Sequence, residues 1–311
     1  MMSTNLSKST EWLATHRATI GGSNAAAAVG LHPYKTPTAL YYEMVLGQAE
    51  DLESNPDALR GTLLEPIARE RLRTVLGIQI IEHDQNDFIR NKKYPFAHCL
   101  PDGWIVFEGE RIPIELKVPH PRNWRRLDVE VPDYIQAQGV HNAAVCVAPA
   151  LMLCCLNPVT MEIYRQLYEP SQDAIDALME AEERFCDQYI IPRIAPPPQT
   201  HDDLKLLFPR HIDGKRITAT EDIEIAWNEL IAVGATAKHA EERKKDLSFV
   251  IKNFLEDGET LVSEGGKILA TYKSHLETRI DTNKLKADMP EIYRQFASEK
   301  PVRTFLVKKP R

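Results

Sequence analysis

Two carboxylates and a lysine stand close together in the sequence, in a pattern that could hold a metal ion beside a phosphate. Asp102 belongs to the tripeptide PDG, and Glu115 and Lys117 belong to the strand-like tetrapeptide IELK. Because successive side chains alternate between the two faces of a strand, Glu115 and Lys117 share one face. The apolar residues beside them take the other face, which we expect to be buried.

A hairpin would bring Asp102 to the other two groups. The tetrapeptide EGER predicts its loop, between the strand-like stretches WIVF and RIPIELKV. In this register Phe107 lies near Ile112, and Asp102 lies across from the region of Glu115 and Lys117.

Such a cluster has two interpretations. Neighbouring carboxylates repel each other, and an oxygen-coordinated divalent cation such as Mg²⁺ would relieve that repulsion while keeping water molecules for chemistry. The lysine would orient or activate an attacking water and stabilise charge that develops on a phosphate. The alternative is an exposed strand face on which an acid and a lysine form an ordinary ion pair.

The sequence around the cluster predicts alternating helices and strands. Apolar spacing predicts helices over residues 38–46, 62–76, 133–145 and 169–187. Strands are predicted in GIQII, DFI, WIVF and RIPIELKV, and as a pair joined at Asn157-Pro158. Near the beginning, Ser23 or Asn24 would cap a short helix through its side-chain oxygen.

A proline run, APPP, predicts a domain boundary because proline continues neither a helix nor a central strand. We therefore expect two domains, over residues 1–195 and 196–311. The second would contain long helices over residues 219–255, broken at Val233-Gly234, then a hairpin in LVSEGGKILATYKS, a helix and a basic end. The predicted fold class is α/β, with a helical and small-sheet extension.

Composition limits the protein class. Of the 311 residues, 43% are hydrophobic and 27% are charged, as in soluble globular proteins. No apolar run reaches the roughly 18 to 20 residues of a membrane helix, and the first residues lack the apolar stretch of a secretory signal, so we expect a cytoplasmic protein. Five cysteines without a CxxC pair predict reduced thiols rather than a metal site. The net charge of −7 argues against a static nucleic-acid coat.

The chain resembles the YqaJ-like viral recombinase family, relatives of lambda exonuclease among the PD-(D/E)xK nucleases. The resemblance rests on ordered blocks that include Trp12 and Arg17, followed by IGGSNAAAAVG, GLHPYKTP, GTLLEPIAR, PDG, IELKV and YIQAQ. It extends to the tail in ILATYKS, MPEIYRQF and RTFLVKK. It implies a restriction-endonuclease-like core, with a mixed central sheet flanked by helices.

The resemblance implies roles for the residues of the cluster. Asp102, Glu115 and the backbone carbonyl of Leu116 would ligate Mg²⁺, for which Mn²⁺ would substitute, and Lys117 would serve the hydrolytic water. Glu65 would complete the acidic cluster through a water or a second metal. Its alternative is a capping box in TLLE, residues 62–65, where Glu65 would only satisfy a helix amide.

Further positions would surround the cluster. Gln136 would lie beside it, with Gln138 a less certain neighbour, although either could belong to an exposed helix face. His98 would lie near the metal or, alternatively, be a satisfied core histidine or one close to DNA.

Three arginines and a serine would bind the DNA substrate. Arg17 and Ser23 match the positions that hold a terminal 5′-phosphate. Arg122 and Arg125 follow the cluster in a basic stretch that would contact the DNA backbone, or would instead pair with the acids after it.

The function that the resemblance implies is a Mg²⁺-dependent 5′-to-3′ exonuclease on linear double-stranded DNA. It would leave 3′ single-stranded overhangs for a phage single-strand annealing protein, inside a bacterial host, and a ring-shaped trimer would retain the DNA. Two alternatives remain: endonucleolytic or structure-specific cutting by the same fold, and a non-catalytic protein that binds DNA ends.

Overall fold

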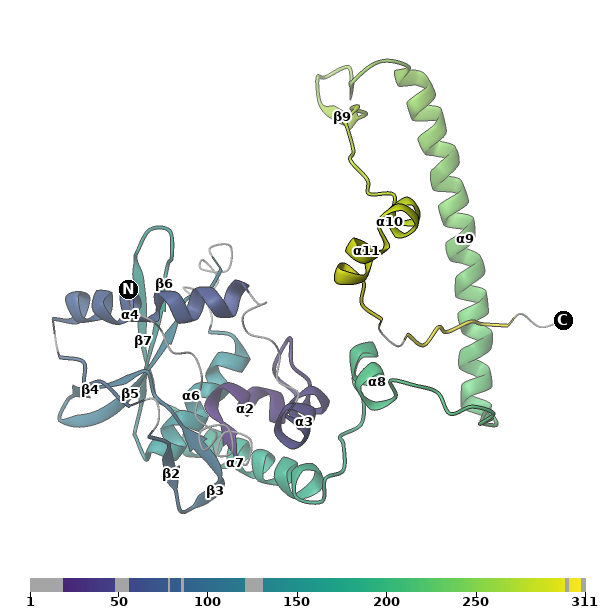
Figure 1. Ribbon diagram of the computed structural model, residues 1–311. Coiled ribbons are helices and arrows are strands. Elements are labelled where there is room, and N and C mark those ends of the chain that lie inside the picture. The colour runs from purple at the N-terminus through teal and green to yellow at the C-terminus, as the bar shows by residue number, and fades with distance from the viewer. Residues whose placement is uncertain are drawn as a thin grey trace. The chain divides into compact units, whose positions relative to one another are not determined.

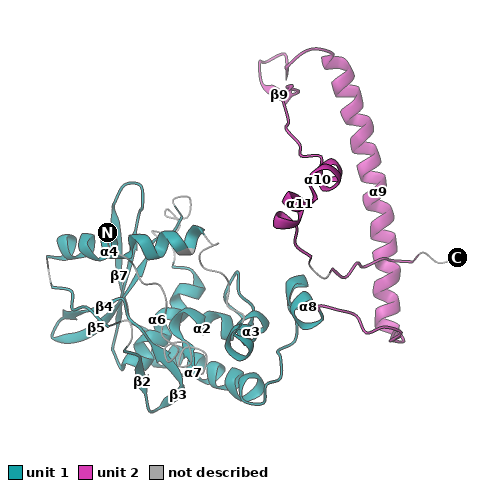
Figure 2. Cartoon of the chain, viewed as in Figure 1, with its two compact units in different colours: residues 1–208 teal, residues 209–311 magenta. Residues whose placement is uncertain are grey.

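The structure, a computed structural model, describes residues 19–47, 56–77, 79–84, 87–120, 131–299 and 302–308. The chain divides into two compact units, Met1–Phe208 and Pro209–Arg311 (Figure 2). The first unit therefore extends beyond the boundary expected after residue 195.

The proline run stays with the first unit because side chains at the beginning of α3 (Pro37–Leu46) bind it. The Thr38 hydroxyl donates to the carbonyls of Pro196 and Pro197 at 3.3 and 3.2 Å. The Thr36 hydroxyl donates to Asp203 at 2.6 Å, which fixes the short helix after the prolines.

The first unit mixes helices and strands along the chain (Figure 1). Its elements are β1 (Ile20–Gly21), α2 (Gly22–Ala28), α3 (Pro37–Leu46), α4 (Pro56–Leu76), β2 (Ile89–Asn91), β3 (Tyr94–Cys99), β4 (Gly103–Phe107), β5 (Glu110–Lys117), α6 (Asp133–Cys146), β6 (Leu151–Leu156), β7 (Ile163–Tyr168), α7 (Gln172–Phe185), the π-helical turn η2 (Cys186–Ile190) and α8 (His201–Leu207).

The central sheet has the strand order β4-β5-β6-β7. Its outer pairs are antiparallel, while β5 and β6 run parallel and are connected through α6. A smaller sheet has the order β1-β3-β2. The mixed sheet with flanking helices confirms the expected α/β class, whereas strand β3 was not predicted.

Apolar residues cover both faces of the central sheet. On one face Ile112, Ile114 and Leu116 pack with Ala68 and Leu72 of α4. On the other face, Leu151, Leu153 and Cys155 of β6 pack with Ile135 of α6. The alternation predicted for β5 is therefore confirmed, and Glu115 and Lys117 belong to the face that α6 covers.

The hairpin between β4 and β5 is tighter than expected. Its loop is only Glu108-Gly109, with φ of 50° and 86°, the left-handed geometry of a two-residue hairpin turn. Ile105 therefore pairs with Ile112, instead of Phe107, and Gly103 pairs with Ile114. Continued by one residue, this register sets Asp102 opposite Glu115.

Three helix predictions need correction. The predicted helix over residues 62–76 begins earlier, at Pro56. Helix α2 has Gly21 at its N-cap with no side-chain cap, so neither Ser23 nor Asn24 caps it. The long helix of the second unit is continuous through Gly234, because a single glycine costs a helix only about 1 kcal/mol relative to alanine.

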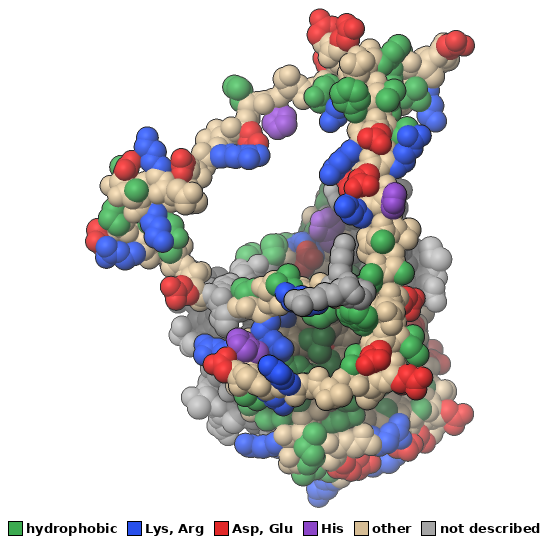
Figure 3. All heavy atoms as spheres, turned by 90° about the vertical axis from the view of Figure 1, so that its right-hand side faces the viewer, with side chains coloured by type: hydrophobic (Ala, Val, Ile, Leu, Met, Phe, Trp, Pro, Cys, Tyr) green, Lys and Arg blue, Asp and Glu red, His purple; other side chains and the backbone are tan. Residues whose placement is uncertain are grey.

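The second unit consists of one long helix and small elements. They are α9 (Glu221–Leu255), the hairpin β8 (Thr260–Val262) and β9 (Ile268–Thr271), α10 (Thr282–Asp288) and α11 (Pro290–Phe296). Among its described residues only Leu255 is buried. The side chains exposed along α9 are hydrophobic, acidic and basic (Figure 3).

The structure also describes the cysteines and bears on the question of a membrane-spanning helix. Of the five cysteines, which are all free thiols, Cys99, Cys154, Cys155 and Cys186 are buried and Cys146 is half-buried. No helix in the described part of the chain has the length and hydropathy needed to cross a bilayer.

Candidate active site

The hairpin end and one face of α6 bring the predicted groups together. Glu115 is 5% exposed, and each of its carboxylate oxygens has an amide partner on α6. Gln138 Nε2 donates to Oε1 at 2.6 Å, and Asn142 Nδ2 donates to Oε2 at 3.0 Å. Because Gln138 and Asn142 are four residues apart, they share one face of the helix. Helix α6 therefore fixes the orientation of the Glu115 carboxylate.

Lys117 completes this arrangement from the same face of β5. Its Nζ lies 2.6 Å from Glu115 Oε1 and donates to Gln138 Oε1 at 2.8 Å. Burial lowers the pKa of Lys117, but the charges of Glu115 and Asp102 outweigh burial, and the pKa is raised. The amine is therefore an ammonium ion at neutral pH.

Asp102 is half-buried immediately before β4. Its Oδ2 accepts a hydrogen bond of 2.6 Å from the backbone N–H of Leu116. Burial raises the pKa of the Asp102 carboxyl well above its usual range, and the charges of Glu115 and Glu65 add to the effect. The three predicted groups thus share one electrostatic environment, which contains an excess of negative charge.

Glu65 reaches this environment from α4. Its charge acts on Asp102, while its Oε1 accepts a 2.6 Å hydrogen bond from Arg69 one turn later, and its side chain is 35% exposed. The capping-box alternative for Glu65 fails because the helix begins at Pro56, well before Thr62.

The structure places Gln138, rather than Gln136, in contact with the cluster. Gln136 Nε2 donates to the carbonyl of Val131 at 2.6 Å, at the beginning of α6. Sequence reasoning missed Asn142 altogether. The signal that could have found it is its spacing of four residues from Gln138 on a helix that follows a strand bearing an acid.

The beginning of α2 packs against this part of α6. Gly22 is buried, and a Cβ at this position would overlap Asn142 Oδ1, so only glycine permits the approach. Ser23, the next residue, is exposed in the first turn of α2.

A second polar network adjoins the first, and its side chains are buried. His98 Nδ1 lies 2.8 Å from the Thr19 hydroxyl. His141 Nδ1 lies 2.9 Å from Glu182 Oε1, and its Nε2 lies 2.9 Å from the carbonyl of His98. Both ring nitrogens of His141 therefore face acceptors, as in an imidazolium ion. The interpretation of His98 as a satisfied core histidine is confirmed.

Burial and pairing act on His141 in opposite directions. Burial lowers its pKa, but the charge and hydrogen bond of Glu182 outweigh burial and raise it. Both side chains are fully buried, so this ion pair belongs to the core.

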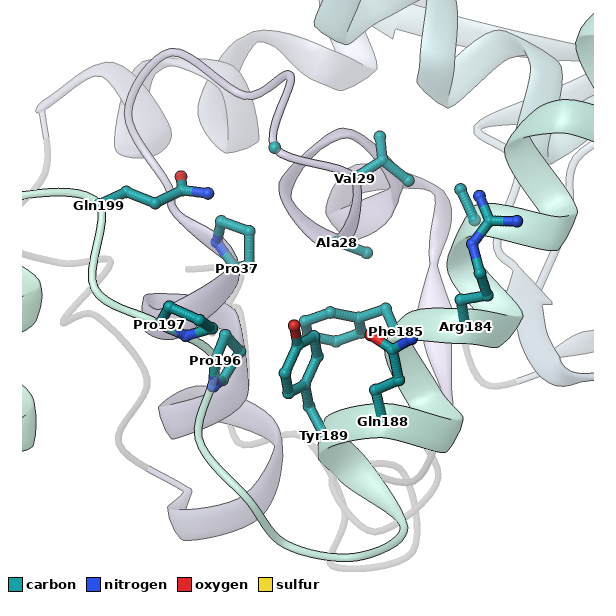
Figure 4. Close-up of a pocket in the computed structure, with 12 residues that line it drawn as sticks. Ala28, Val29, Pro37, Arg184, Phe185, Gln188, Tyr189, Pro196, Pro197 and Gln199 are labelled. Atoms are coloured by element: carbon teal, nitrogen blue, oxygen red, sulfur yellow. The ribbon is translucent and has the colours of Figure 1, made fainter.

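Three of the predicted DNA-binding residues, Arg17, Arg122 and Arg125, lie outside the described residues. A pocket of about 330 Å³ in the first unit lies elsewhere, between the end of α2, the end of α7 and the proline run (Figure 4). Phe185, Tyr189 and Pro197 are among the residues that line it, whereas Asp102, Glu115 and Lys117 are not.

The donor set of the cluster suits a hard divalent cation. Within the described residues, no three side chains of His, Cys, Asp or Glu gather closely enough to bind a metal ion alone. Magnesium typically uses one or two carboxylates, with waters and substrate phosphates as its other ligands. Asp102 and Glu115 meet that requirement, and a cation between them would relieve the repulsion that raises the pKa of Asp102.

Comparison with known proteins finds a family model and two relatives that this chain resembles. Residues 11–148 match the YqaJ-like viral recombinase domain. The YqaJ protein of Bacillus subtilis (strain 168) is 26% identical over 307 residues, which cover 96% of this chain and 93% of that protein. Protein D345L of African swine fever virus (isolate Tick/Malawi/Lil 20-1/1983) is 28% identical over 160 residues, covering 42% of this chain and 44% of that protein.

A solved structure also resembles part of this chain. The alkaline exonuclease LHK-Exo from Laribacter hongkongensis is 19% identical, with a TM-score of 0.47, covering 58% of this chain and 92% of that chain. The match of the domain confirms the resemblance inferred from the sequence blocks. Residues 11–148 of this chain are similar to the YqaJ-like viral recombinase domain, as the sequence blocks predicted.

Proposed function

We propose that this chain is a metal-dependent exonuclease that digests linear double-stranded DNA from its 5′ ends and leaves 3′ single-stranded overhangs. The observation that supports this most is the convergence of Asp102, Glu115 and Lys117 at one end of the hairpin. The match of residues 11–148 to the YqaJ-like viral recombinase domain supports a role in strand-annealing recombination.

In this proposal, Asp102, Glu115 and the carbonyl of Leu116 hold Mg²⁺, or Mn²⁺ in its place. When bound, the cation would polarise the phosphodiester and lower the pKa of a coordinated water. Glu65 acts from α4, through a water or a second metal.

Other residues of the chain position the Glu115 carboxylate and act on the phosphate and the attacking water. Gln138 and Asn142 hold the Glu115 carboxylate in one orientation. Lys117 is a cation, so it stabilises the charge that develops on the phosphate and orients the attacking water by donating to it, rather than removing its proton.

Arg17 and Ser23 would hold the terminal 5′-phosphate, and Arg122 and Arg125 would contact the DNA backbone. The partners that we propose are double-stranded DNA ends, a phage single-strand annealing protein and further copies of this chain in a ring-shaped trimer. The setting that we propose is the cytoplasm of a bacterial host, with a phage or prophage as the source of the gene.

The test is digestion of linear duplexes labelled at either end, beside a covalently closed circle, with Mg²⁺ or Mn²⁺. We expect mononucleotides from the 5′ ends, intact circles, no activity with a chelator and no activity in Asp102→Asn. Cutting of circles would support an endonuclease. Binding of ends without hydrolysis under any divalent cation would support a non-catalytic protein, and either result would contradict the proposal.

A further inference from the structure

Helix α6 presents a line of three side chains to the strand that carries the cluster. Tyr134, Gln138 and Asn142 are spaced four residues apart and so lie on one face of the helix. Asn142 bonds Glu115, and Gln138 bonds both Glu115 and Lys117. The line therefore follows β5 toward its end, and Tyr134 occupies the next position, beyond Lys117.

The loop between α2 and α3 brings two further rings to this position. The ring of His32 meets that of Tyr134 edge-on, with 5.4 Å between centroids. The ring of Tyr34 meets that of His32 in the same manner, at 6.1 Å. We call these three side chains the aromatic shelf.

The loop that carries the shelf is well fixed. The backbone N–H groups of Tyr34 and Lys35 donate to His32 Nδ1 at 3.2 and 2.9 Å. Lys35 Nζ pairs with Glu43 of α3 at 2.6 Å and donates to Asn24 of α2 at 3.1 Å. The loop is thus tied to both helices that flank it, so the rings of His32 and Tyr34 have a supported backbone.

The outermost ring of the shelf faces solvent, whereas the innermost is partly covered. Tyr34 is 84% exposed, whereas Tyr134 is half-buried. Burial raises the pKa of the Tyr134 hydroxyl, and the charges of Lys117 and Tyr34 act on it in opposite directions. The shelf therefore extends from the surroundings of the Lys117 ammonium out to the surface.

We propose that the aromatic shelf is a subsite that stacks the base of the terminal nucleotide, while its phosphodiester lies at the catalytic cluster. This inference rests on the proposed function and adds to it a contact with a nucleobase. Stacking on an aromatic ring requires no positive charge and tolerates every base. Such a contact suits a protein of net charge −7 that must hold successive nucleotides of any sequence.

The test pairs a protein change with a substrate change. Duplexes carry a 5′-phosphate and either a normal or an abasic terminal nucleotide, and their affinities are measured by fluorescence anisotropy with Ca²⁺ in place of Mg²⁺. We expect Tyr34→Ala to weaken binding of the normal end about 5- to 150-fold, the range typical of one stacked base. We expect less than a twofold change for the abasic end, while Tyr34→Phe retains binding to both.

The matched control is Phe107→Ala. Phe107 is a partly exposed aromatic residue beside the turn of the β4–β5 hairpin, and the cluster lies at the opposite end of that hairpin. We expect Phe107→Ala to have no effect on either substrate. Equal losses on normal and abasic ends, or no loss in Tyr34→Ala, would overturn the shelf while the wild-type protein still hydrolyses DNA. A wild-type protein that hydrolyses no DNA end would instead contradict the proposed function, and the shelf with it.

Discussion

His141 and Asn142 are consecutive residues of α6, yet they serve two different polar networks. Asn142 holds Glu115, in a cluster where the charges of Glu115 and Glu65 act on Asp102. Lys117 opposes them, and Arg69 pairs with Glu65. His141 pairs with Glu182, one cation with one anion, and both are fully buried. The second network is balanced and closed, whereas the first carries excess negative charge and is partly accessible, since the Lys117 side chain is 28% exposed.

The difference teaches what identifies a candidate site. Burial of polar groups is common to both networks, so burial alone does not indicate function. What distinguishes the cluster is repulsion that the chain itself leaves uncompensated, which a cation and a substrate phosphate would resolve.

The largest effect should come from Lys117→Ala. Because Lys117 supplies the positive charge at the reacting phosphate, we expect kcat to fall by about 10²- to 10⁴-fold. The midpoint of thermal unfolding should also fall, because the buried Glu115 carboxylate loses its ion-pair partner, so kcat is compared at a temperature where both proteins are folded. Arg111→Ala, at the exposed beginning of the same strand, is the control and should retain kcat. Equal rates for Lys117→Ala and wild type would remove this lysine from the mechanism.

Glu182→Ala should lower the stability of the protein rather than its kcat. Removing one partner of a buried ion pair leaves the other charge unpaired, and we expect the free energy of unfolding to fall by about 3 to 5 kcal/mol. Under conditions where the variant remains folded, hydrolysis should continue. Chemical denaturation and end-labelled digestion would measure both quantities.

The pH dependence of this loss follows from the raised pKa of His141. The pair contributes its full stability below the usual histidine pKa, and the contribution is lost as pH rises through the higher folded-state value. The destabilisation by Glu182→Ala should therefore be greatest in acid and shrink in alkali. A loss that grows with pH would show that His141 is neutral in the folded protein.

A smaller effect should come from the contact between α2 and α6. Gly22→Ala places a methyl group where Asn142 Oδ1 lies, so we expect about 1 to 3 kcal/mol of destabilisation and reduced kcat, because Glu115 loses its orientation. Gly61→Ala is the control, since a Cβ at this helical glycine meets no atom within 4 Å. It should stabilise the protein slightly. Equal effects of the two substitutions in denaturation and in activity would contradict the contact.

The smallest effect concerns the pH dependence of cation binding. Because burial and neighbouring carboxylates raise the pKa of Asp102, Mg²⁺ must displace a proton below that pKa. The affinity should therefore rise up to about tenfold per pH unit, and level off above the pKa. Calorimetry in buffers of different ionisation enthalpy would detect the released proton. An affinity that does not vary with pH would contradict the raised pKa.

Much of the fold could be predicted where local pattern and tertiary contacts agree. The alternation of RIPIELKV predicted a strand with Glu115 and Lys117 on one face, and the spacing of residues 133–145 predicted the helix that covers them. Strand β3 was missed because its sequence, YPFAHC, contains a proline and lacks alternation, and its pairing with β1 joins residues distant in sequence.

The site was predictable in its charges but not in its supports. Acids and a lysine can be recognised as candidate site residues by their type alone. Gln138 and Asn142 are amides, and their role depends on how α6 lies over β5. The aromatic shelf likewise joins a loop and a helix about a hundred residues apart in the sequence. Such contacts follow from the fold, and no local pattern encodes them.

The most direct test of the account is the binding of Mn²⁺ to the full-length protein, followed by its electron paramagnetic resonance signal. We predict saturable binding by the wild-type chain, a loss of affinity of at least about tenfold in Asp102→Asn and in Glu115→Gln, and unchanged binding in Glu108→Gln, which alters an exposed carboxylate of the hairpin loop. Equal affinity in all four proteins would contradict the claim that this hairpin gathers a metal-binding catalytic cluster.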